Sequence, residues 1–223
     1  MIEVLNGYAG LGGNRKLWRN VKVTAVEKNP EIAAIYQDLF PEDTVIVGDA
    51  HEYLLEHYMR FPFIWLSRPC TTHSKIRFFV GVRAKGFAPV YPDYGLYEEI
   101  TFLKYNAVGL YTAENVVPYY EPLIKPTAKI GRHLLWANFE IKPMDTTAEG
   151  LRTKNTISEV EALRGLDLSK YKIKNKRQLL RNCVDDLIGN HIFNCAFPST
   201  KSIHSPVVKS AAIKQESMQN TLF

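Results

Sequence analysis

The fold is decided by residues 2–13, which read IEVLNGYAGLGG. The first four residues, IEVL, form a short apolar run of the kind found in a buried strand. The glycines that follow permit a tight turn, in which backbone amides can approach a ligand at the start of a helix. The turn alone fits a structural bend as well as it fits a cofactor loop. The segments that follow it therefore carry the interpretation.

The first 115 residues continue this alternation of strand and helix. Apolar and β-branched runs predict four further strands, at residues 21–26, 45–47, 63–66 and 109–113. Helices are predicted between them, at residues 30–40, 50–58 and 94–105. Asn29 is a suitable N-cap and Pro30 a suitable first residue for the first helix. Strands separated by helices predict an α/β fold with a doubly wound, mostly parallel sheet, to which residues 133–139 add a sixth strand.

The composition is that of an ordinary globular protein. Of the 223 residues, 46% are hydrophobic and 23% are charged, which excludes a disordered, collagen-like or membrane-spanning chain. The longest apolar runs, such as residues 61–66, are far shorter than the roughly 20 residues that span a bilayer. The three cysteines have no metal-ligand spacing, and the start, MIEV, lacks the features of a signal peptide. We therefore expect a cytoplasmic protein, with no membrane and no metal among its partners.

The formal net charge is +5, and the basic residues gather in two segments. Residues 141–182 hold ten Lys and Arg against five acids, and residues 68–95 hold five against Asp93 alone. Two solvated surfaces explain this pattern as well as a nucleic-acid site does, unless the segments flank a catalytic site. We expect a catalytic and cofactor-binding domain at 1–140, a small basic recognition insertion at 141–176, returning helices at 177–197 and a tail at 198–223.

Polar residues stand where three consecutive predicted strands end, which is where a doubly wound sheet binds ligands. The glycine-rich turn follows the first strand, Glu27 ends the second, and Asp49 follows the third. A carboxylate at Glu27 can accept both hydroxyls of a ribose, and one at Asp49 can accept a hydrogen bond from an adenine amino group. Each acid alone could be an ordinary surface residue. Together, and without a Walker lysine, they predict an adenosyl cofactor that has no pyrophosphate to be held.

The ends of the fourth and fifth strands carry residues suited to covalent catalysis. Cys70 lies in the polar loop SRPCTTHS, residues 67–74, where basic neighbours favour a thiolate. A cysteine is otherwise most often a small buried apolar residue. Glu114 emerges beside this loop and could protonate a ring nitrogen, and Arg132 is a cation that could hold an oxygen acceptor or a phosphate.

These motifs, in this order, resemble the DNA cytosine-5 methyltransferase family. The family's opening pattern, an acid followed by Leu-Phe-Ala-Gly, any residue and Gly-Gly, corresponds to residues 6–13. The later motifs of the family, its Pro-Cys, its Glu-Asn-Val, the second arginine of its Arg-x-Arg and its Gly-Asn, correspond to Pro69-Cys70, Glu114-Asn115-Val116, Arg132 and Gly189-Asn190. The resemblance covers the predicted catalytic domain and the returning helices.

The resemblance implies a Rossmann-like methyltransferase fold that binds S-adenosyl-L-methionine and methylates C5 of a cytosine flipped out of the duplex. The implied catalytic residues are Cys70, the nucleophile at cytosine C6, Glu114 at N3 and Arg132 at O2. The implied cofactor-binding residues are Tyr8, Ala9, Gly10, Gly12, Gly13, Glu27, Asp49 and Asn190. Residues 71–95, basic and rich in aromatics, are expected to form a mobile loop that closes over the base. The implied partner is double-stranded DNA in a prokaryotic or phage-infected cell, and the family allows a cognate restriction endonuclease as a second partner.

The sequence also departs from the family. Asn6 replaces an acid near the cofactor, Arg68 stands where the family has proline or a small residue, and Ile130 replaces the first arginine of the Arg-x-Arg pair. The recognition segment is far shorter than usual, which predicts a compact enzyme with a short or degenerate target. Two alternatives stay open: an RNA cytosine-5 methyltransferase, and a non-catalytic DNA-binding protein that senses the cofactor. An amino methyltransferase is disfavoured, because Cys70 stands where that chemistry needs an aromatic residue after a Pro-Pro run.

Overall fold

The computed structural model describes residues 1–145 and 155–198. Seven strands form within these ranges: β1 (Ile2–Gly7), β2 (Val21–Glu27), β3 (Thr44–Val47), β4 (Phe63–Leu66), β5 (Leu110–Val116), β6 (Ala128–Ile130) and β7 (His133–Ala137). Six α-helices accompany them: α1 (Pro30–Leu39), α2 (Ala50–His57), α3 (Gly95–Asn106), α4 (Ile157–Arg164), α5 (Lys176–Asn182) and α6 (Asp186–Ala196). A 3-10 turn, η1 (Tyr58–Arg60), and a π-helix, η2 (Ile76–Ala84), complete the described elements.

The strands form one sheet in the order β3-β2-β1-β4-β5-β7-β6. The first five are parallel, and β7 is antiparallel to both β5 and β6. This arrangement confirms the predicted doubly wound, mostly parallel fold. From β3 the chain crosses back past β1 to β4, so the carboxyl ends of β1 and β4 form the switch point at which such sheets bind ligands. The predicted sixth strand is β7, which ends at Ala137, and β6 was not predicted.

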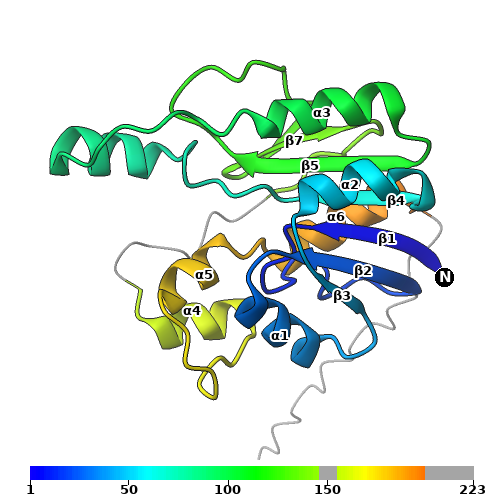
Figure 1. Ribbon diagram of the computed structural model, residues 1–223, viewed down its shortest axis with the longest axis horizontal. Helices are drawn as coiled ribbons and strands as arrows, with labels where there is room; N and C mark the ends of the chain where they lie inside the picture. Colours follow the sequence, from blue (N-terminus) through cyan, green and yellow to red (C-terminus); the bar gives the residue numbers. More distant parts are fainter. Residues whose placement is uncertain (146–154, 199–223) are drawn as a thin grey trace, which may run out of the picture.

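Helices cover both faces of the sheet because successive strand residues point to opposite sides. In β1, Val4 packs into the core shared with α1 and α6, and its neighbour Leu5 packs into the core shared with α2 and α3. All four residues of β4 are buried, as expected for a central parallel strand. Figure 1 shows α2 and α3 together on one side of the sheet and α1 on the other.

The helix α1 begins where its sequence directs it to begin. The Asn29 side-chain oxygen accepts hydrogen bonds from the amides of Glu31 and Ile32, and Pro30 occupies the first turn. This cap satisfies amides that have no partner inside the helix. Because the cap residue Asn29 lies two residues after Glu27, the last residue of β2, it fixes the path of the backbone at the end of this strand.

The described part of the predicted insertion, together with the helix α5 that follows it, packs onto the main domain. Val160 of α4 and Leu180 of α5 share a core with Leu11 of the glycine-rich turn and Ile35 of α1. Figure 1 accordingly shows α4 and α5 beside α1. Residues 146–154 of the insertion, and all of the predicted tail beyond Pro198, lie outside the described residues.

The segment between β4 and α3 projects from the body of the molecule. We call residues 71–93 the arm; it is the blue-green segment that reaches the far left of Figure 1. We expected this segment to be a loop, but it contains the π-helix η2. Several of its large apolar side chains are exposed, namely those of Ile76, Phe79, Val80, Phe87, Val90 and Tyr91.

Candidate active site

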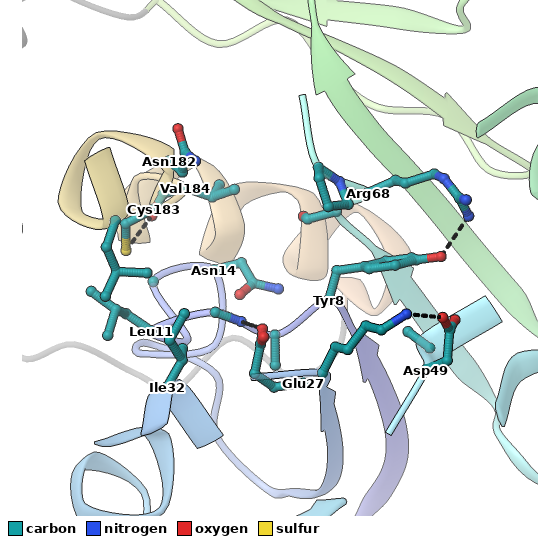
Figure 2. Close-up of a pocket in the computed structure, with 18 of the residues that line it drawn as sticks. Tyr8, Leu11, Asn14, Glu27, Ile32, Asp49, Arg68, Asn182, Cys183 and Val184 are labelled. Carbon is teal, nitrogen blue, oxygen red and sulfur yellow. Dashed lines mark hydrogen bonds and ion pairs between the residues drawn. The ribbon is translucent and has the colours of Figure 1, made fainter. Parts of the chain in front are cut away.

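Two neighbouring cavities lie at the carboxyl ends of the strands. We call the first the switch-point pocket; its volume is about 390 Å³, within the usual range for small-molecule sites. Figure 2 shows Tyr8, Glu27 and Asp49, which follow or end β1, β2 and β3, arranged around this pocket. Six of the eight predicted cofactor-binding residues line it: Tyr8, Ala9, Gly10, Gly13, Glu27 and Asp49.

Glu27 is held in place by backbone amides. One carboxylate oxygen accepts a hydrogen bond from the amide of Gly10 at 3.0 Å, and the other accepts one from the amide of Asn29 at 2.9 Å. A carboxylate oxygen has two lone pairs, so each of these oxygens can still accept a hydroxyl. The side chain is therefore an oriented acceptor at the edge of the pocket.

Asp49 lines the pocket and also makes two structural contacts. Its side chain caps α2 by accepting from the amide of His51 at 2.9 Å, and it pairs with Nζ of Lys28 at 3.0 Å. The hydrogen bond from Lys28 holds the pKa of Asp49 below its usual value. The carboxyl group is therefore ionised and accepts hydrogen bonds at neutral pH.

Tyr8 has an unusual backbone conformation. Its φ angle is +58°, in the left-handed region that non-glycine residues adopt only rarely. Its hydroxyl contacts Glu99 and Arg68, and burial followed by the charge of Glu99 raises its pKa well above the usual value. The ring is thus neutral and fixed at the wall of the pocket. Strained positions of this kind concentrate at functional sites.

Two predicted cofactor residues lie elsewhere. Gly12 is not among the described lining residues, and Asn190 lies half-buried on α6, also outside the lining. The C-terminal part contributes Asn182 instead, with Cys183 and Val184. The signal for Asn182 is its position, because it ends a helix and directly precedes two buried residues.

Asn6 and Asn14 explain one departure from the family. Asn6 is 1% exposed and accepts a hydrogen bond from the side-chain amide of Asn14 at 2.9 Å. Asn14 lines the pocket. In place of an acid, the chain therefore has a buried amide that is hydrogen-bonded to a second amide in the pocket lining.

The second cavity, which we call the cysteine cleft, has a volume of about 600 Å³. Cys70 and Arg132 line it together with residues of the arm and of α5. The arm supplies the cations Arg77 and Lys85, and α5 supplies Arg177 and Arg181. No acidic residue lines this cleft in the described part of the chain. Cations from both basic segments therefore line one cleft.

Three lysines of the basic segment 141–182 lie outside this lining, namely Lys172, Lys174 and Lys176. Lys172 and Lys174 are exposed but are not lining residues, and Nζ of Lys176 donates to the carbonyl oxygen of Leu168 at 2.5 Å. Lys176 therefore ties the loop before α5 to that helix. Within the segment 141–182, the cations that line the cleft are Arg177 and Arg181 of α5 instead.

Opposing charges act on Cys70. Burial raises the pKa of its thiol, the charge of Glu114 raises it further, and the charge of Arg132 lowers it. Cys70 and Arg132 both line the cysteine cleft, whereas Glu114 is 5% exposed and is not among the lining residues. Ile130, at the position of the first arginine of the Arg-x-Arg pair, is 2% exposed and belongs to the core, so it does not line the cleft.

A chain of hydrogen bonds orients Glu114. Nε of Arg132 lies 3.4 Å from Nε2 of His133, and Nδ1 of His133 contacts the carboxylate of Glu114. Arg132 can only donate, so Nε2 accepts and the ring proton lies on Nδ1, which donates to Glu114. Asn115 fixes the cysteine loop, because its side-chain amide donates to the carbonyl oxygen of Arg68 at 3.0 Å.

Neither a membrane span nor a metal centre is found among the described residues. None of their helices is both long enough and apolar enough to cross a bilayer. No group of three or more His, Cys, Asp or Glu side chains in residues 1–145 and 155–198 is arranged to hold a metal ion.

Comparison with known proteins identifies the fold. No protein-family model matches the chain, and no curated protein matches it. A methyltransferase of Entamoeba histolytica, EhMeth, is similar at 11% identity with a TM-score of 0.53, over 91% of this chain and 99% of that one. The putative methyltransferase yhhF of Escherichia coli shares 15% identity over 61% and 74% of the two chains, with a TM-score of 0.41. DNMT2 of Spodoptera frugiperda shares 19% over 52% of this chain and 36% of that one, with a TM-score of 0.37. The chain has the Rossmann-like fold of S-adenosylmethionine-dependent methyltransferases.

Proposed function

We propose that this protein is an S-adenosylmethionine-dependent methyltransferase that methylates C5 of cytosine in DNA, with Cys70 as the nucleophile. The observation that carries the proposal is the adjacency of the two cavities. Pro69 lines the switch-point pocket, Cys70 lines the cysteine cleft, and Asn182 lines both. A nucleophile therefore stands at the boundary between a nucleoside-type pocket and a basic cleft. The fold shared with the Entamoeba methyltransferase agrees with this activity.

The switch-point pocket suits S-adenosylmethionine. Glu27 and Asp49 are acceptors for ribose hydroxyls and for an adenine amino group, and Tyr8 offers an aromatic wall. Gly13 allows the turn to lie close to the C-terminal part, since a Cβ there would meet the carbonyl oxygen of Val184 at 2.2 Å. When bound, S-adenosylmethionine supplies an electrophilic methyl group.

The residues of the cysteine cleft act on the cytosine ring. The thiolate of Cys70 adds to C6, and the electron pair that this releases is stabilised by protonation of N3. We assign this proton to Glu114, whose charge acts on Cys70 although its side chain is not a lining residue of the cleft. Arg132 holds O2, so the ring is fixed while C5 becomes nucleophilic. C5 would then take the methyl group, whose bond to the cofactor sulfur would break and leave S-adenosylhomocysteine. A base removes the C5 proton, the C6–S bond breaks, and Cys70 is free again.

The two walls of the cleft suit the two parts of a nucleotide. The arm contributes the apolar side chains of Ile76, Val80 and Phe87, and α5 contributes Arg177 and Arg181. Guanidinium groups bind phosphates, and apolar and aromatic side chains pack against bases. We therefore propose that phosphates contact α5 and the two cations of the arm, Arg77 and Lys85, and that the target base enters between this helix and the arm.

The experiment is a methylation assay with radiolabelled cofactor on duplex DNA, single-stranded DNA and RNA. We expect methyl transfer to cytosine in duplex DNA, and a trapped covalent adduct with DNA that contains 5-fluorocytosine, because fluorine cannot leave as a proton. Cys70→Ala should abolish transfer and adduct formation while S-adenosylhomocysteine still binds. Cys195→Ala is the matched control and should behave as wild type.

Three results would contradict the proposal. Wild-type activity in Cys70→Ala would exclude this nucleophile. Transfer to RNA in place of DNA would replace the substrate, and duplex binding with no transfer to any of the three substrates would favour the non-catalytic alternative.

A further inference from the structure

Arg68 connects the switch-point pocket to the arm. Its Nη1 donates to the hydroxyl of Tyr8 at 2.6 Å, and its Nε donates to Oδ2 of Asp93 at 2.8 Å. Tyr8 forms the pocket wall, and Asp93 is the last residue of the arm. Figure 2 shows the Arg68 guanidinium reaching the Tyr8 hydroxyl at the edge of the pocket. One guanidinium therefore bridges a ligand-facing residue and the arm.

A buried carboxylate holds this guanidinium in place. Nη1 of Arg68 also lies 2.5 Å from Oε1 of Glu99, a residue of α3 that is 1% exposed. Gly95 leaves room for the arginine, since a Cβ there would meet Nη2 at 2.3 Å. The position of Arg68 is therefore set by a buried ion pair and a close backbone, and it does not depend on solvent contacts.

The same residues close the loop that carries Cys70. The amide of Asp93 donates to the hydroxyl oxygen of Thr72 at 2.9 Å, two residues after Cys70. On the other side of Cys70, the carbonyl oxygen of Arg68 accepts from Asn115. The nucleophile thus lies between two tethers, and Arg68 takes part in both.

We propose that Arg68 is a positioning residue that couples occupancy of the switch-point pocket to the placement of Cys70. The proposal rests on the proposed function for the identity of the ligand. A nucleoside that packs against Tyr8 restrains the Tyr8 hydroxyl, which restrains Arg68 and, through Asp93 and Thr72, the loop. By thermodynamic linkage, an interaction that fixes the Cys70 loop in this position strengthens ligand binding by the same factor. If Arg68 served only to neutralise Glu99, occupancy of the pocket would have no effect on the placement of Cys70.

The test measures the alkylation rate of Cys70 by iodoacetamide, with and without saturating S-adenosylhomocysteine. Peptide mass spectrometry resolves each cysteine, so Cys195 on α6 serves as an internal reference. In the wild type we expect the ligand to slow alkylation of Cys70 about fivefold or more, the lower range of common site–site couplings. The rate at Cys195 should not change.

Two variants separate coupling from simple shielding by the ligand. Arg68→Lys keeps a charge beside Glu99 but lacks the fork that reaches two partners, and Asp93→Asn removes the ion pair with little change of shape. In both, the ligand should change the Cys70 rate by less than about twofold while calorimetry still detects binding. Arg83→Lys makes the same replacement at an exposed arginine of the arm, and it should respond like wild type.

The experiment distinguishes failure of the coupling from failure of the proposed function. An unchanged, wild-type response in Arg68→Lys and Asp93→Asn would mean direct shielding and would overturn the coupling alone. A wild type that binds the ligand with no change at Cys70 would do the same. If S-adenosylhomocysteine does not bind the wild type at all, the proposed function and this inference both fall.

Discussion

At the scale of single residues, the thiol of Cys70 is controlled by two charges of opposite sign. Burial raises its pKa, and the nearby carboxylate of Glu114 raises it further, because a negative charge disfavours a second one. Arg132 acts in the opposite direction. The free protein therefore holds Cys70 as a thiol at neutral pH. Removing the negative charge at position 114 would therefore favour the thiolate of Cys70.

Removing either charge should move the pH dependence of Cys70 alkylation. Glu114→Gln removes a negative charge and lowers the thiol pKa, so the rate should rise at a lower pH than in wild type. Arg132→Gln removes a positive charge and should move the profile to higher pH. We expect displacements of about one pH unit each, the scale of a nearby charge. Iodoacetamide kinetics between pH 6 and about 10, read at the Cys70 peptide, give the measurement.

Cys195 again supplies the reference, since its profile should be the same in both variants. Two displacements in the same direction would mean that the substitutions act through local unfolding, and the electrostatic account of Cys70 would then be wrong.

Residues at strand ends were predictable, and residues positioned by distant partners were not. Glu27 and Asp49 line the pocket because a parallel sheet brings its carboxyl ends to one edge. The ion pair of Arg68 with Glu99 joins positions 31 residues apart, and no local pattern marks it. Asn190 matched a motif by its neighbour Gly189, but Gly189 serves packing: a Cβ there would meet the carbonyl oxygen of Asn14 at 2.3 Å.

At the scale of elements, the glycine-rich turn packs closely against the junction of α5 with α6. Gly13→Ala places a methyl group 2.2 Å from the carbonyl oxygen of Val184 and 2.3 Å from Sγ of Cys183. Backbone atoms cannot move aside as a flexible side chain can, so the junction must shift. We expect a loss of about 1–3 kcal/mol in the free energy of unfolding, measured by urea denaturation, together with weaker binding of S-adenosylhomocysteine.

Gly48→Ala is the control for this variant. The nearest atom to its new methyl group is Cγ2 of Ile46 at 3.8 Å, an ordinary contact, so its stability should stay within about 0.5 kcal/mol of wild type. Equal losses in both variants would contradict the packing argument for Gly13.

The elements that escaped prediction lack a periodic signal. The strand β6 has only three residues, Ala128–Ile130, too few to show alternation. The π-helix Ile76–Ala84 exposes apolar residues such as Phe79 and Val80, so it has no single buried face for a helical period to reveal. Long, one-sided elements such as α3 were predictable because burial imposes their pattern.

At the scale of the whole molecule, the sheet alone does not make the active site. The carboxyl ends of the strands supply Glu27, Asp49 and Cys70, but α5 closes both cavities from the other side, and Asn182 lines both. In Figure 1 the arm and α5 lie on the same side of the molecule, with α5 beside α1. The sequence indicated which segments were basic, but not that an apolar core with Leu11 and Ile35 seats α4 and α5 at this edge.

This arrangement predicts how binding of duplex DNA depends on salt. Arg77 of the arm and Arg181 of α5 both line the cysteine cleft. If each neutralises one phosphate, the slope of log affinity against log salt should become less steep by about 0.9 for Arg77→Gln or Arg181→Gln, and by about 1.8 for the double variant. Fluorescence anisotropy over a salt series measures the slope. Lys104→Gln, on the exposed face of α3, is the control and should keep the wild-type slope.

Phosphate contacts carry no sequence information, so the variants should weaken binding to all duplexes alike. A change in which cytosines are methylated, with the slope unaltered, would instead make these arginines base readers and refute the assignment of the two walls.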